Sequence, residues 1–471
     1  MKRRLLATLA ILIGLVLVGS YAGYQRSLNR KLRENLRTAI EVALDDIRSE
    51  GLPVTPEEFA TWVTKPPLAE NAADLICEAT NYFHGPVSQS QGRERRRGDW
   101  AETEDREVRL PIVGSGKLPP CTEPLSNAVV RAADELLATN SESLALLHRA
   151  SEIKTCRFAI DWTPLCGVRL PHLSNVKWGT QLLQLEALLR FEEGHTGQAV
   201  ESLQASFGVA RSLAQEPAVI SQFIRLRCNL QAIDVLERLL TRSSISRLDA
   251  DKLVDDLIGA EDIDGLTRAY ILERVCAIQG YRQLQAAHVS WRAVLRDLHN
   301  ASWSELRFYP RLLWQEHRYR TGGLAELDFL AALEMRSVCI RMSRLPFPQR
   351  VTAVRQLKLS EETLSQKQMS FLPMPASTVA MMKHARYVAV LRTARAALVV
   401  EQYRADGEPP ETLPLAPADP FTGEPLLYKK LTKGYVVYSV GEDGEDNGGA
   451  EKNAQGRSYG PGTDITFTVE R

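Results

Sequence analysis

The residues best suited to chemistry lie in an acidic, glycine-rich stretch near the C-terminus, VGEDGEDNGGAEKNAQGRSYGPGTD (residues 440–464). Its side-chain oxygens belong to Glu442, Asp443, Glu445, Asp446, Asn447 and Asp464. Hard cations such as calcium bind about six to eight oxygens from carboxylates and backbone carbonyls. Glycines allow the backbone to fold tightly enough for such oxygens to converge. The composition of this stretch fits two interpretations, a cation site or a solvated acidic loop.

The sequence contains none of the common catalytic motifs. The eight histidines are scattered, and there is no HExxH zinc motif, no GxxxxGK[ST] phosphate loop and no GxSxG nucleophile motif. Asp161 and His172 lie in a loop-like stretch where a catalytic site without a known motif would be located. A structural role is the favoured interpretation of His172. We therefore name no catalytic residue and expect that the protein is not an enzyme.

The seven cysteines include no CxxC pair, so neither a zinc ribbon nor a thioredoxin-type site is indicated. Cys156 and Cys166 flank a short loop-like stretch, RFAIDWTPL. In an oxidising compartment these two cysteines would be able to form a disulfide. Free structural thiols are the alternative interpretation.

Length and charge bound the remaining possibilities. The chain has 471 residues, with 58 Lys and Arg against 58 Asp and Glu, so its formal net charge is zero. A nucleic-acid-binding protein usually has a strongly basic domain or face, and this balance argues against one. Hydrophobic residues make up 44% of the chain and charged residues 25%, which is typical of globular domains.

The N-terminus predicts a membrane anchor. Residues 2–4 are basic, and residues 5–24 carry no charge, close to the roughly 20 residues with which a helix crosses a bilayer. We predict a signal anchor over residues 1–25 in the inner (cytoplasmic) membrane, single-pass, with the C-terminal bulk in the periplasm. A signal peptide cleaved near residues 20–22 is an alternative. Basic residues also follow the span, so a reversed orientation in the membrane is a third interpretation.

Hydrophobic periodicity predicts a mainly helical protein. Residues 26–122 are expected to form a helical stalk followed by a polar loop, and residues 123–350 an antiparallel helical bundle, ended by Pro346 and Pro348. Residues 182–217 resemble one tetratricopeptide hairpin, with Gly194 at the turn and Pro217 ending the second helix. Solenoids need about three such repeats, and only one copy is present, so we predict a bundle.

The C-terminal region, residues 377–471, has a different pattern. Ser377 is a suitable N-cap for a long helix over residues 378–403. Three short stretches with strand character follow at residues 426–430, 435–440 and 465–469. This order predicts an α+β module in which the long helix packs on a three-stranded antiparallel sheet.

The same region resembles the major pseudopilins of type II secretion. The matching motifs are DPFTGEPLLYKK (419–430), GYVVYSVGEDGEDNGG (434–449) and TDI (463–465). The resemblance implies one calcium ion in the loop between the last strands, held by the Val440 carbonyl and by the carboxylates of Asp443 and Asp464. Asp446 has no fixed counterpart in that family and is added from its place in the loop.

Two departures limit the resemblance. The N-terminus has neither the pseudopilin processing site nor a glutamate inside the hydrophobic helix, so assembly into a pseudopilus is not expected. The whole chain is similar to envelope proteins that join a membrane anchor and a helical bundle to this C-terminal module. That similarity implies no known reaction.

We therefore predict a membrane-tethered, non-enzymatic scaffold or interaction protein of the cell envelope, related to secretion, which engages an unknown protein partner. The alternative is an extracytoplasmic hydrolase, or a lipid- or peptide-binding protein, that uses the helical bundle. A deep pocket lined by His172, Asp161 or neighbouring carboxylates would favour chemistry, whereas an open apolar groove would favour binding.

Overall fold

The computed structural model describes residues 2–63, 70–85, 108–262, 264–286, 323–364, 374–404, 410–451 and 462–471. Within these ranges, the side chains of residues 2–23, 25, 26, 166, 284, 286 and 358–376 are not described. The helices are α1 (Lys2–Ser49), α2 (Pro56–Val63), α3 (Ala72–Ala79), α4 (Asn127–Thr139), α5 (Ser141–Glu152), the 3-10 helix η1 (Leu165–Gly167), α6 (His172–Glu192), α7 (Thr196–Arg211), α8 (Val219–Arg242), α9 (Arg247–Ala260), α10 (Asp264–Ala286), α14 (Leu324–Ser343), α15 (Gln349–Leu364) and α16 (Met374–Arg404). The strands are β1 (Leu427–Lys430), β2 (Tyr435–Ser439) and β3 (Ile465–Val469).

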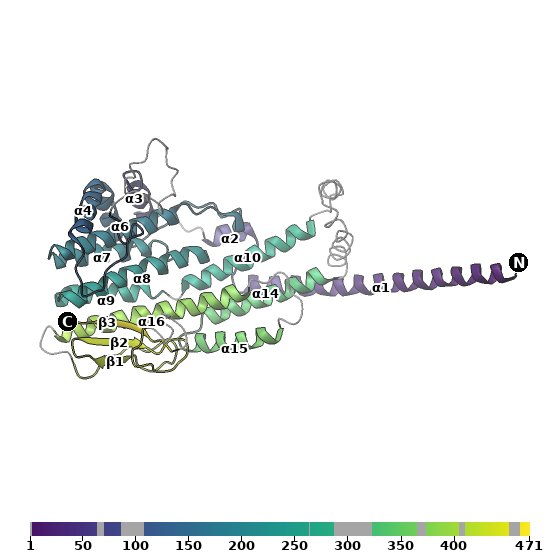
Figure 1. The fold of residues 1–471 in the computed structure, drawn as a ribbon. Helices are drawn as coiled ribbons and strands as arrows, with labels where there is room; N and C mark the ends of the chain where they lie inside the picture. Colours follow the sequence, from purple (N-terminus) through teal and green to yellow (C-terminus); the bar gives the residue numbers. More distant parts are fainter. Residues whose placement is uncertain are drawn as a thin grey trace.

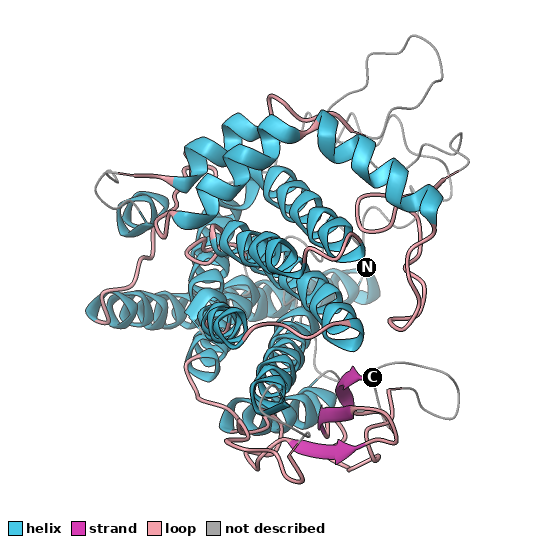
Figure 2. Ribbon diagram, turned by 90° about the vertical axis from the view of Figure 1, so that its left-hand side faces the viewer, coloured by secondary structure: helices cyan, strands magenta, loops and turns pink. Residues whose placement is uncertain are grey.

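The prediction of a mainly helical chain with one small antiparallel sheet is confirmed. The sheet has the order β1-β2-β3, and both strand pairs are antiparallel. Figure 2 shows the sheet at one edge of the molecule, with most helices viewed nearly along their axes. The finer assignments, a tetratricopeptide-like hairpin and a pseudopilin-like module, stay predictions, as do the domain boundaries.

Helix α1 joins the body at its inner end and projects away from it at its outer end (Figure 1). Ile40, Leu44 and Ile47 of its inner half are buried in the core. The predicted anchor, residues 1–25, is the outer end of α1, and its side chains before Tyr24 lie outside the described residues. Among the helices that the structure describes, none combines the length and the apolar character of a membrane span.

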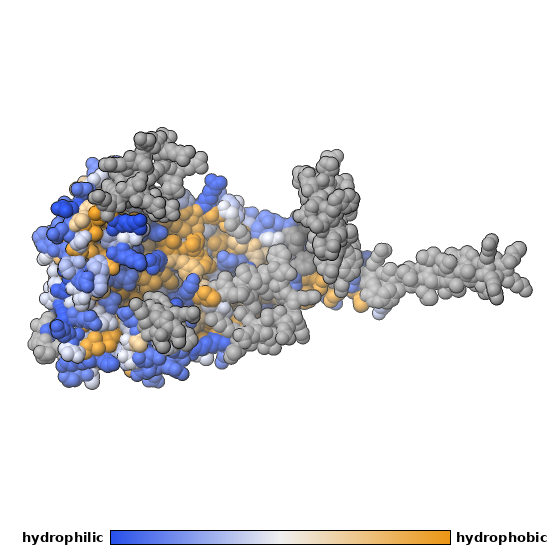
Figure 3. Space-filling view, in the orientation of Figure 1, coloured by the Kyte–Doolittle hydropathy of each residue, from blue (hydrophilic) through white to orange (hydrophobic). Residues whose placement is uncertain are grey.

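Apolar side chains gather where α1 leaves the body. Leu28 and Leu32 of α1 and Leu324 and Leu327 of α14 are 39–51% exposed. The two helices touch here, because Leu32 lies against Gly323 at the start of α14. Figure 3 shows hydrophobic surface at this place, next to undescribed residues of the chain. We call these four leucines the collar.

The two helices expected over residues 182–217 are present as α6 and α7. They meet at Gly194, whose φ of +82° is a left-handed conformation that favours glycine. The expectation that Pro217 ends the second helix is wrong, because α7 ends earlier, at Arg211. The chain turns there because Gln222 Nε2 of α8 donates to the carbonyls of Leu213 and Glu216 at 3.0 and 2.7 Å.

Two other helix ends differ from expectation. Helix α16 begins at Met374, so Ser377 lies inside its first turn and is not the N-cap. Pro375 fits the first turn of a helix, where its missing N–H costs no hydrogen bond. Helix α15 is not among the predicted elements, and it begins at Gln349 directly after Pro348. The two prolines predicted to end the helical run therefore precede a further helix.

Helix α16 lies between the sheet on one side and α8 and α9 on the other (Figure 1). Tyr387, Leu391, Ala394 and Leu398 form an apolar stripe along the helix, and each is at most 1% exposed. Val388, Ala396 and Val400, which lie off this stripe, are buried as well. One continuous hydrophobic core joins α16 to the sheet and to α6, α7, α8 and α9. Helix α16 therefore belongs to both parts of the fold.

Helix α8 covers the free edge of the sheet. The backbone N–H of Thr468 in β3 donates to Glu237 Oε1 at 2.6 Å. The hydroxyl of Thr241 donates to the Thr468 carbonyl at 3.3 Å. Glu237 and Thr241 are one helical turn apart, so together they satisfy an edge residue as a neighbouring strand would.

The Glu237 carboxyl makes stability depend on pH. Burial raises its pKa from 4.5 to about 8. Between these values the native protein binds a proton that the unfolded chain releases, so the free energy of unfolding falls as pH rises through this window. Glu237→Gln keeps an acceptor for Thr468 and removes the titration. We expect the variant to gain stability relative to the wild type as pH rises.

Urea unfolding of both proteins at about pH 5 and about pH 9 measures this difference. Thr241→Val is the control, because it removes one hydrogen bond and should cost about 1 kcal/mol at both pH values. Equal pH dependence of the wild type and Glu237→Gln would contradict the assignment.

Candidate functional site

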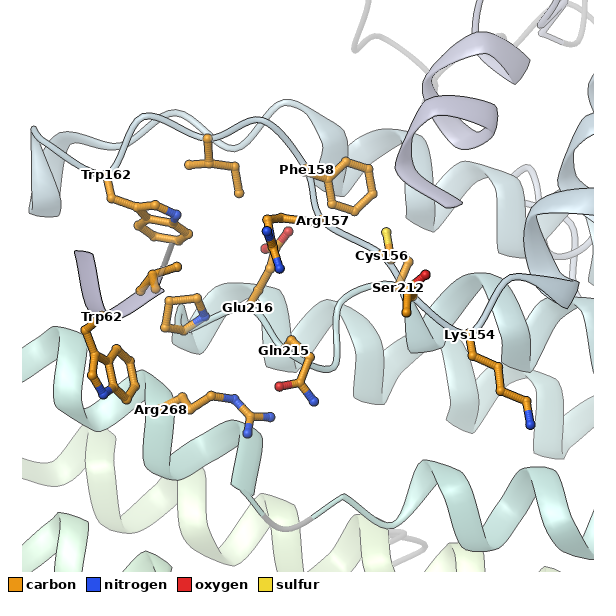
Figure 4. A pocket seen from close by; sticks show the side chains of 14 residues that line it. Trp62, Lys154, Cys156, Arg157, Phe158, Trp162, Ser212, Gln215, Glu216 and Arg268 are labelled. Atoms are coloured by element: carbon orange, nitrogen blue, oxygen red, sulfur yellow. The ribbon is translucent and has the colours of Figure 1, made fainter. Parts of the chain in front are cut away.

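A cavity of about 500 Å³ lies between α2, the extended segment 153–164, the turn after α7, and α10 (Figure 4). Its walls combine apolar, cationic, polar and acidic side chains from these four segments. They are Trp62, Val63, Lys154, Thr155, Cys156, Arg157, Phe158, Ile160, Trp162, Ser212, Gln215, Glu216, Pro217 and Arg268. The volume lies within the range of about 300–1,000 Å³ that is usual for small-molecule sites.

Asn71 holds the extended wall of the cavity in place. As the N-cap of α3, it accepts from the backbone N–H of Ala73 at 3.3 Å. Its Oδ1 also accepts from the Arg157 N–H at 2.8 Å, and its Nδ2 donates to the Arg157 carbonyl at 3.0 Å. The Ala72 N–H donates to the Thr155 carbonyl at 3.0 Å. The segment is thereby tied to the start of α3.

Aromatic side chains form one end of the cavity. Trp62 and Trp162 each lie 5.9 Å from the ring of Phe59, which is fully buried. Figure 4 shows both tryptophans at the same end of the cavity, with Lys154 at the opposite end. Ring contacts of this kind add to the area that each side chain buries, so the aromatic end is preassembled.

Glu216 is the buried charge of the cavity wall. Its Oε1 lies 2.5 Å from Nε2 of His172, and both side chains are less than a tenth exposed. The pair lacks hydrogen-bond alignment, and within the described part of the chain neither Glu216 oxygen accepts a hydrogen bond. Phe158 stacks on the imidazole with ring centroids 4.2 Å apart. The imidazole is therefore held behind the carboxylate.

The cation nearest to the turn is already paired. Arg268 Nη2 lies 3.0 Å from Asp262 Oδ2 and donates to the Ala214 carbonyl at 2.6 Å. Lys154 is exposed, so water and salt screen its charge. The least solvated charge on the wall is that of Glu216.

The thiol of Cys156 is unsuited to nucleophilic catalysis. Its pKa is raised to about 12, chiefly by burial and also by the charge of Glu216 and the thiol of Cys77, while the Ala73 N–H and the Ser212 hydroxyl act to lower it. The protonated thiol is a poor nucleophile. Cys156 is a free cysteine in this structure.

The disulfide between Cys156 and Cys166 stays a prediction, because the side chain of Cys166 lies outside the described residues. Among the described cysteines, Cys77 in α3 contributes to the raised pKa of Cys156.

The two residues singled out as a hidden site take different positions. His172 contacts Glu216 and Phe158 of the cavity wall but does not itself line the cavity. Asp161 is exposed, accepts from the Thr163 N–H at 2.9 Å, and does not line the cavity. Sequence reasoning missed Glu216 and Trp62, because the site is assembled from segments far apart in the chain and none of them carries a motif.

A second histidine–carboxylate pair is structural in character. His148 Nε2 lies 2.7 Å from Glu186 Oε2, and this contact raises the pKa of the imidazole. The hydroxyl of Ser202 donates to the same oxygen at 2.9 Å. Serine and histidine both bind the carboxylate and do not contact each other in the described geometry, so this arrangement does not activate the serine. It ties α5, α6 and α7 together.

The acidic loop brings two of the predicted calcium ligands together. Asp443 Oδ2 and Asp464 Oδ1 lie 3.4 and 3.5 Å from the same Asn447 Nδ2, which donates to the Glu445 carbonyl at 2.9 Å. Asp464 Oδ2 also accepts from the Gly449 N–H at 2.7 Å. Three oxygens therefore surround the amide nitrogen, a donor set of the kind that hard cations prefer.

The other two predicted ligands lie apart from this point. Asp446 accepts from the Gly448 N–H at 2.8 Å and interacts with the Tyr438 hydroxyl. The Val440 N–H donates to Asp419 Oδ2 at 3.0 Å, and no described contact turns its carbonyl toward the loop. Among the described residues, no three His, Cys, Asp or Glu side chains form a group able to hold a metal.

No protein-family model, curated protein or solved structure matches this chain. The likeness to pseudopilins rests on the motifs of residues 419–465 and stays a prediction.

Cys156 is expected to react slowly with iodoacetamide in the native protein. A thiol with a pKa of about 12 holds about a thousandfold less thiolate at neutral pH than an ordinary cysteine. Peptide mass spectrometry of timed samples measures the rate, and unfolding in urea should abolish the protection. Equal labelling rates for Cys156 in the native and unfolded chain would contradict the burial of this thiol.

Proposed function

We propose that this protein is a membrane-tethered, non-enzymatic scaffold or interaction protein of the cell envelope, with its C-terminal bulk in the periplasm. The observation that carries the proposal is the continuity of α1 (Lys2–Ser49), whose inner half is part of the core. A membrane segment at residues 1–25 would then hold the folded body rigidly. The collar of exposed leucines supports the same orientation, because it borders the predicted span.

The position of the C-terminal sheet supports a role in contacting a partner. The sheet lies at the end of the body opposite to the outer end of α1 (Figure 1). A pseudopilin-like tip would therefore extend away from the membrane, where an unknown protein partner of a secretion or envelope assembly could reach it.

Calcium belongs to this proposal as a stabiliser of the tip. Asp443, Asp464 and the Glu445 carbonyl are the residues that would hold it, with Asn447 turning its amide oxygen inward. The ion would supply positive charge between carboxylates that lie on either side of one amide nitrogen. It would close the loop that joins β2 to β3.

Ligand binding by the helical part is the second candidate function. It is favoured by the cavity of about 500 Å³ and by the carboxylate of Glu216 in its wall. A cavity of this size that combines apolar side chains with polar groups is typical of small-molecule binding. The tether and the cavity are compatible in one protein.

Charges introduced into the predicted span test the tether. Leu12→Lys with Leu15→Lys should cost about 5–7 kcal/mol of insertion free energy, because each lysine near the centre of a span costs about 2.5–3.5 kcal/mol. We expect the wild type to stay in the membrane pellet after alkaline carbonate washing and the double variant to be released. Leu12→Ile with Leu15→Ile is the matched control and should stay in the pellet. Carbonate extraction of the wild type would contradict the tether.

Melting with calcium or with chelator tests the ion site. We expect calcium to raise the melting temperature of the wild type, because a ligand that binds only the native state adds about 2.7 kcal/mol at a hundredfold excess over its Kd. Asp443→Asn should lose this increase. Glu445→Gln is the control, because the exposed Glu445 side chain takes no part in the predicted site. A wild type that calcium does not stabilise would overturn the site.

A further inference from the structure

We propose that the cavity binds a small protonated organic amine with an apolar body, and that Glu216 is its counter-charge. The inference deepens the second candidate function and depends on it. It rests on the juxtaposition of a buried carboxylate, a pair of tryptophans and an enclosed volume (Figure 4).

The carboxylate of Glu216 needs hydrogen-bond donors. The side chain is 8% exposed, and both oxygens are buried without accepting a hydrogen bond in the described part of the chain. A carboxylate has about four lone-pair sites, and a primary ammonium has three N–H donors and no acceptor. His172 Nε2 lies 2.5 Å from Oε1, so Oε2 is left for such a group. A hydrogen bond between an ammonium and a carboxylate is stronger than one between two neutral groups.

The aromatic end of the cavity suits the rest of the ligand. Trp62 is half-buried and Trp162 is 7% exposed. An indole face attracts a cation within about 6 Å of its centre and also packs well against apolar groups. Ile160, Val63 and Pro217 complete this apolar wall. A ligand with an ammonium group and an aromatic or aliphatic body therefore matches both ends of the wall.

The cations of the wall do not reverse this preference. Arg268 is matched by Asp262 at 3.0 Å. Lys154 is exposed and lies at the end away from the tryptophans (Figure 4). Arg157 also lines the wall and has an interaction of its own within the chain. A purely anionic ligand would have to place its charge beside the poorly solvated Glu216, and like charges at close range repel.

Binding of three matched probes to the purified full chain tests the proposal. The probes are 2-phenylethylammonium, 3-phenylpropanoate and 3-phenylpropanol, which differ chiefly in charge. We expect calorimetry to show saturable binding of the ammonium, with the alcohol weaker and the carboxylate weakest. Glu216→Gln should weaken ammonium binding at least tenfold and leave binding of the alcohol unchanged. Asp161→Asn is the control, because this exposed carboxylate does not line the cavity, and it should change ammonium affinity less than twofold.

Because Glu216→Gln leaves His172 without its ion partner, that variant has a risk of misfolding. Trp62→Leu, at the half-buried rim, provides the second measurement and should weaken ammonium binding several-fold while circular dichroism stays unchanged. Tighter binding of the carboxylate, or an unchanged ammonium affinity in a folded Glu216→Gln protein, would overturn the charge assignment. Binding of none of the three probes would overturn the ligand site itself, and it would leave the membrane tether unaffected.

Discussion

The architecture depends on the burial of α16 on two sides. A helix that carries apolar residues on two opposite faces cannot bury both against one neighbour, so it needs two layers of structure to cover it. The sheet covers one side through Tyr435 and Phe467, and α8 and α9 cover the other through Leu236 and Leu253. Each large apolar side chain that is buried contributes about 1.5–3 kcal/mol. This helix therefore couples the folding of the sheet to that of α8 and α9.

Buried polar groups then set the alignment of the layers. The hydroxyl of Tyr387 in α16 accepts from Asn229 of α8 at 2.7 Å and donates to the Ala260 carbonyl at the end of α9 at 3.0 Å. Arg238 of α8 is 1% exposed and donates to the carbonyls of Pro119 and Pro120 at 2.9 and 3.0 Å. Leaving such groups unpaired would cost more than the bonds themselves contribute. A shift of one helix along another is therefore unfavourable, and the layers have a defined register.

Both candidate sites depend on this register. The acidic loop is closed because β2 and β3 are neighbours, which places Asp464 beside the residues that follow β2. The cavity exists because α2, the extended segment 153–164 and α10 are packed around the turn between α7 and α8, which carries Glu216. In each case a carboxylate is held in a position that its own segment would not specify. In the loop, backbone N–H groups donate to the carboxylate of Asp464. In the cavity, the oxygens of Glu216 accept no hydrogen bond within the described part of the chain.

The sequence by itself determined the local structure. Periodicity predicted the helices around Gly194, the long helix that contains Leu391, and all three strands, because spacing of apolar residues reports which face of an element is buried. The sequence also identified Asp443 and Asp464 as candidate ligands, because both belong to one acidic, glycine-rich stretch of the chain. Only the tertiary structure decided that α16 has two buried sides, that α7 ends before Pro217, and that Glu216 lines the same cavity as two tryptophans. These features arise from contacts between segments distant in the chain, and no local pattern of residue types encodes such contacts.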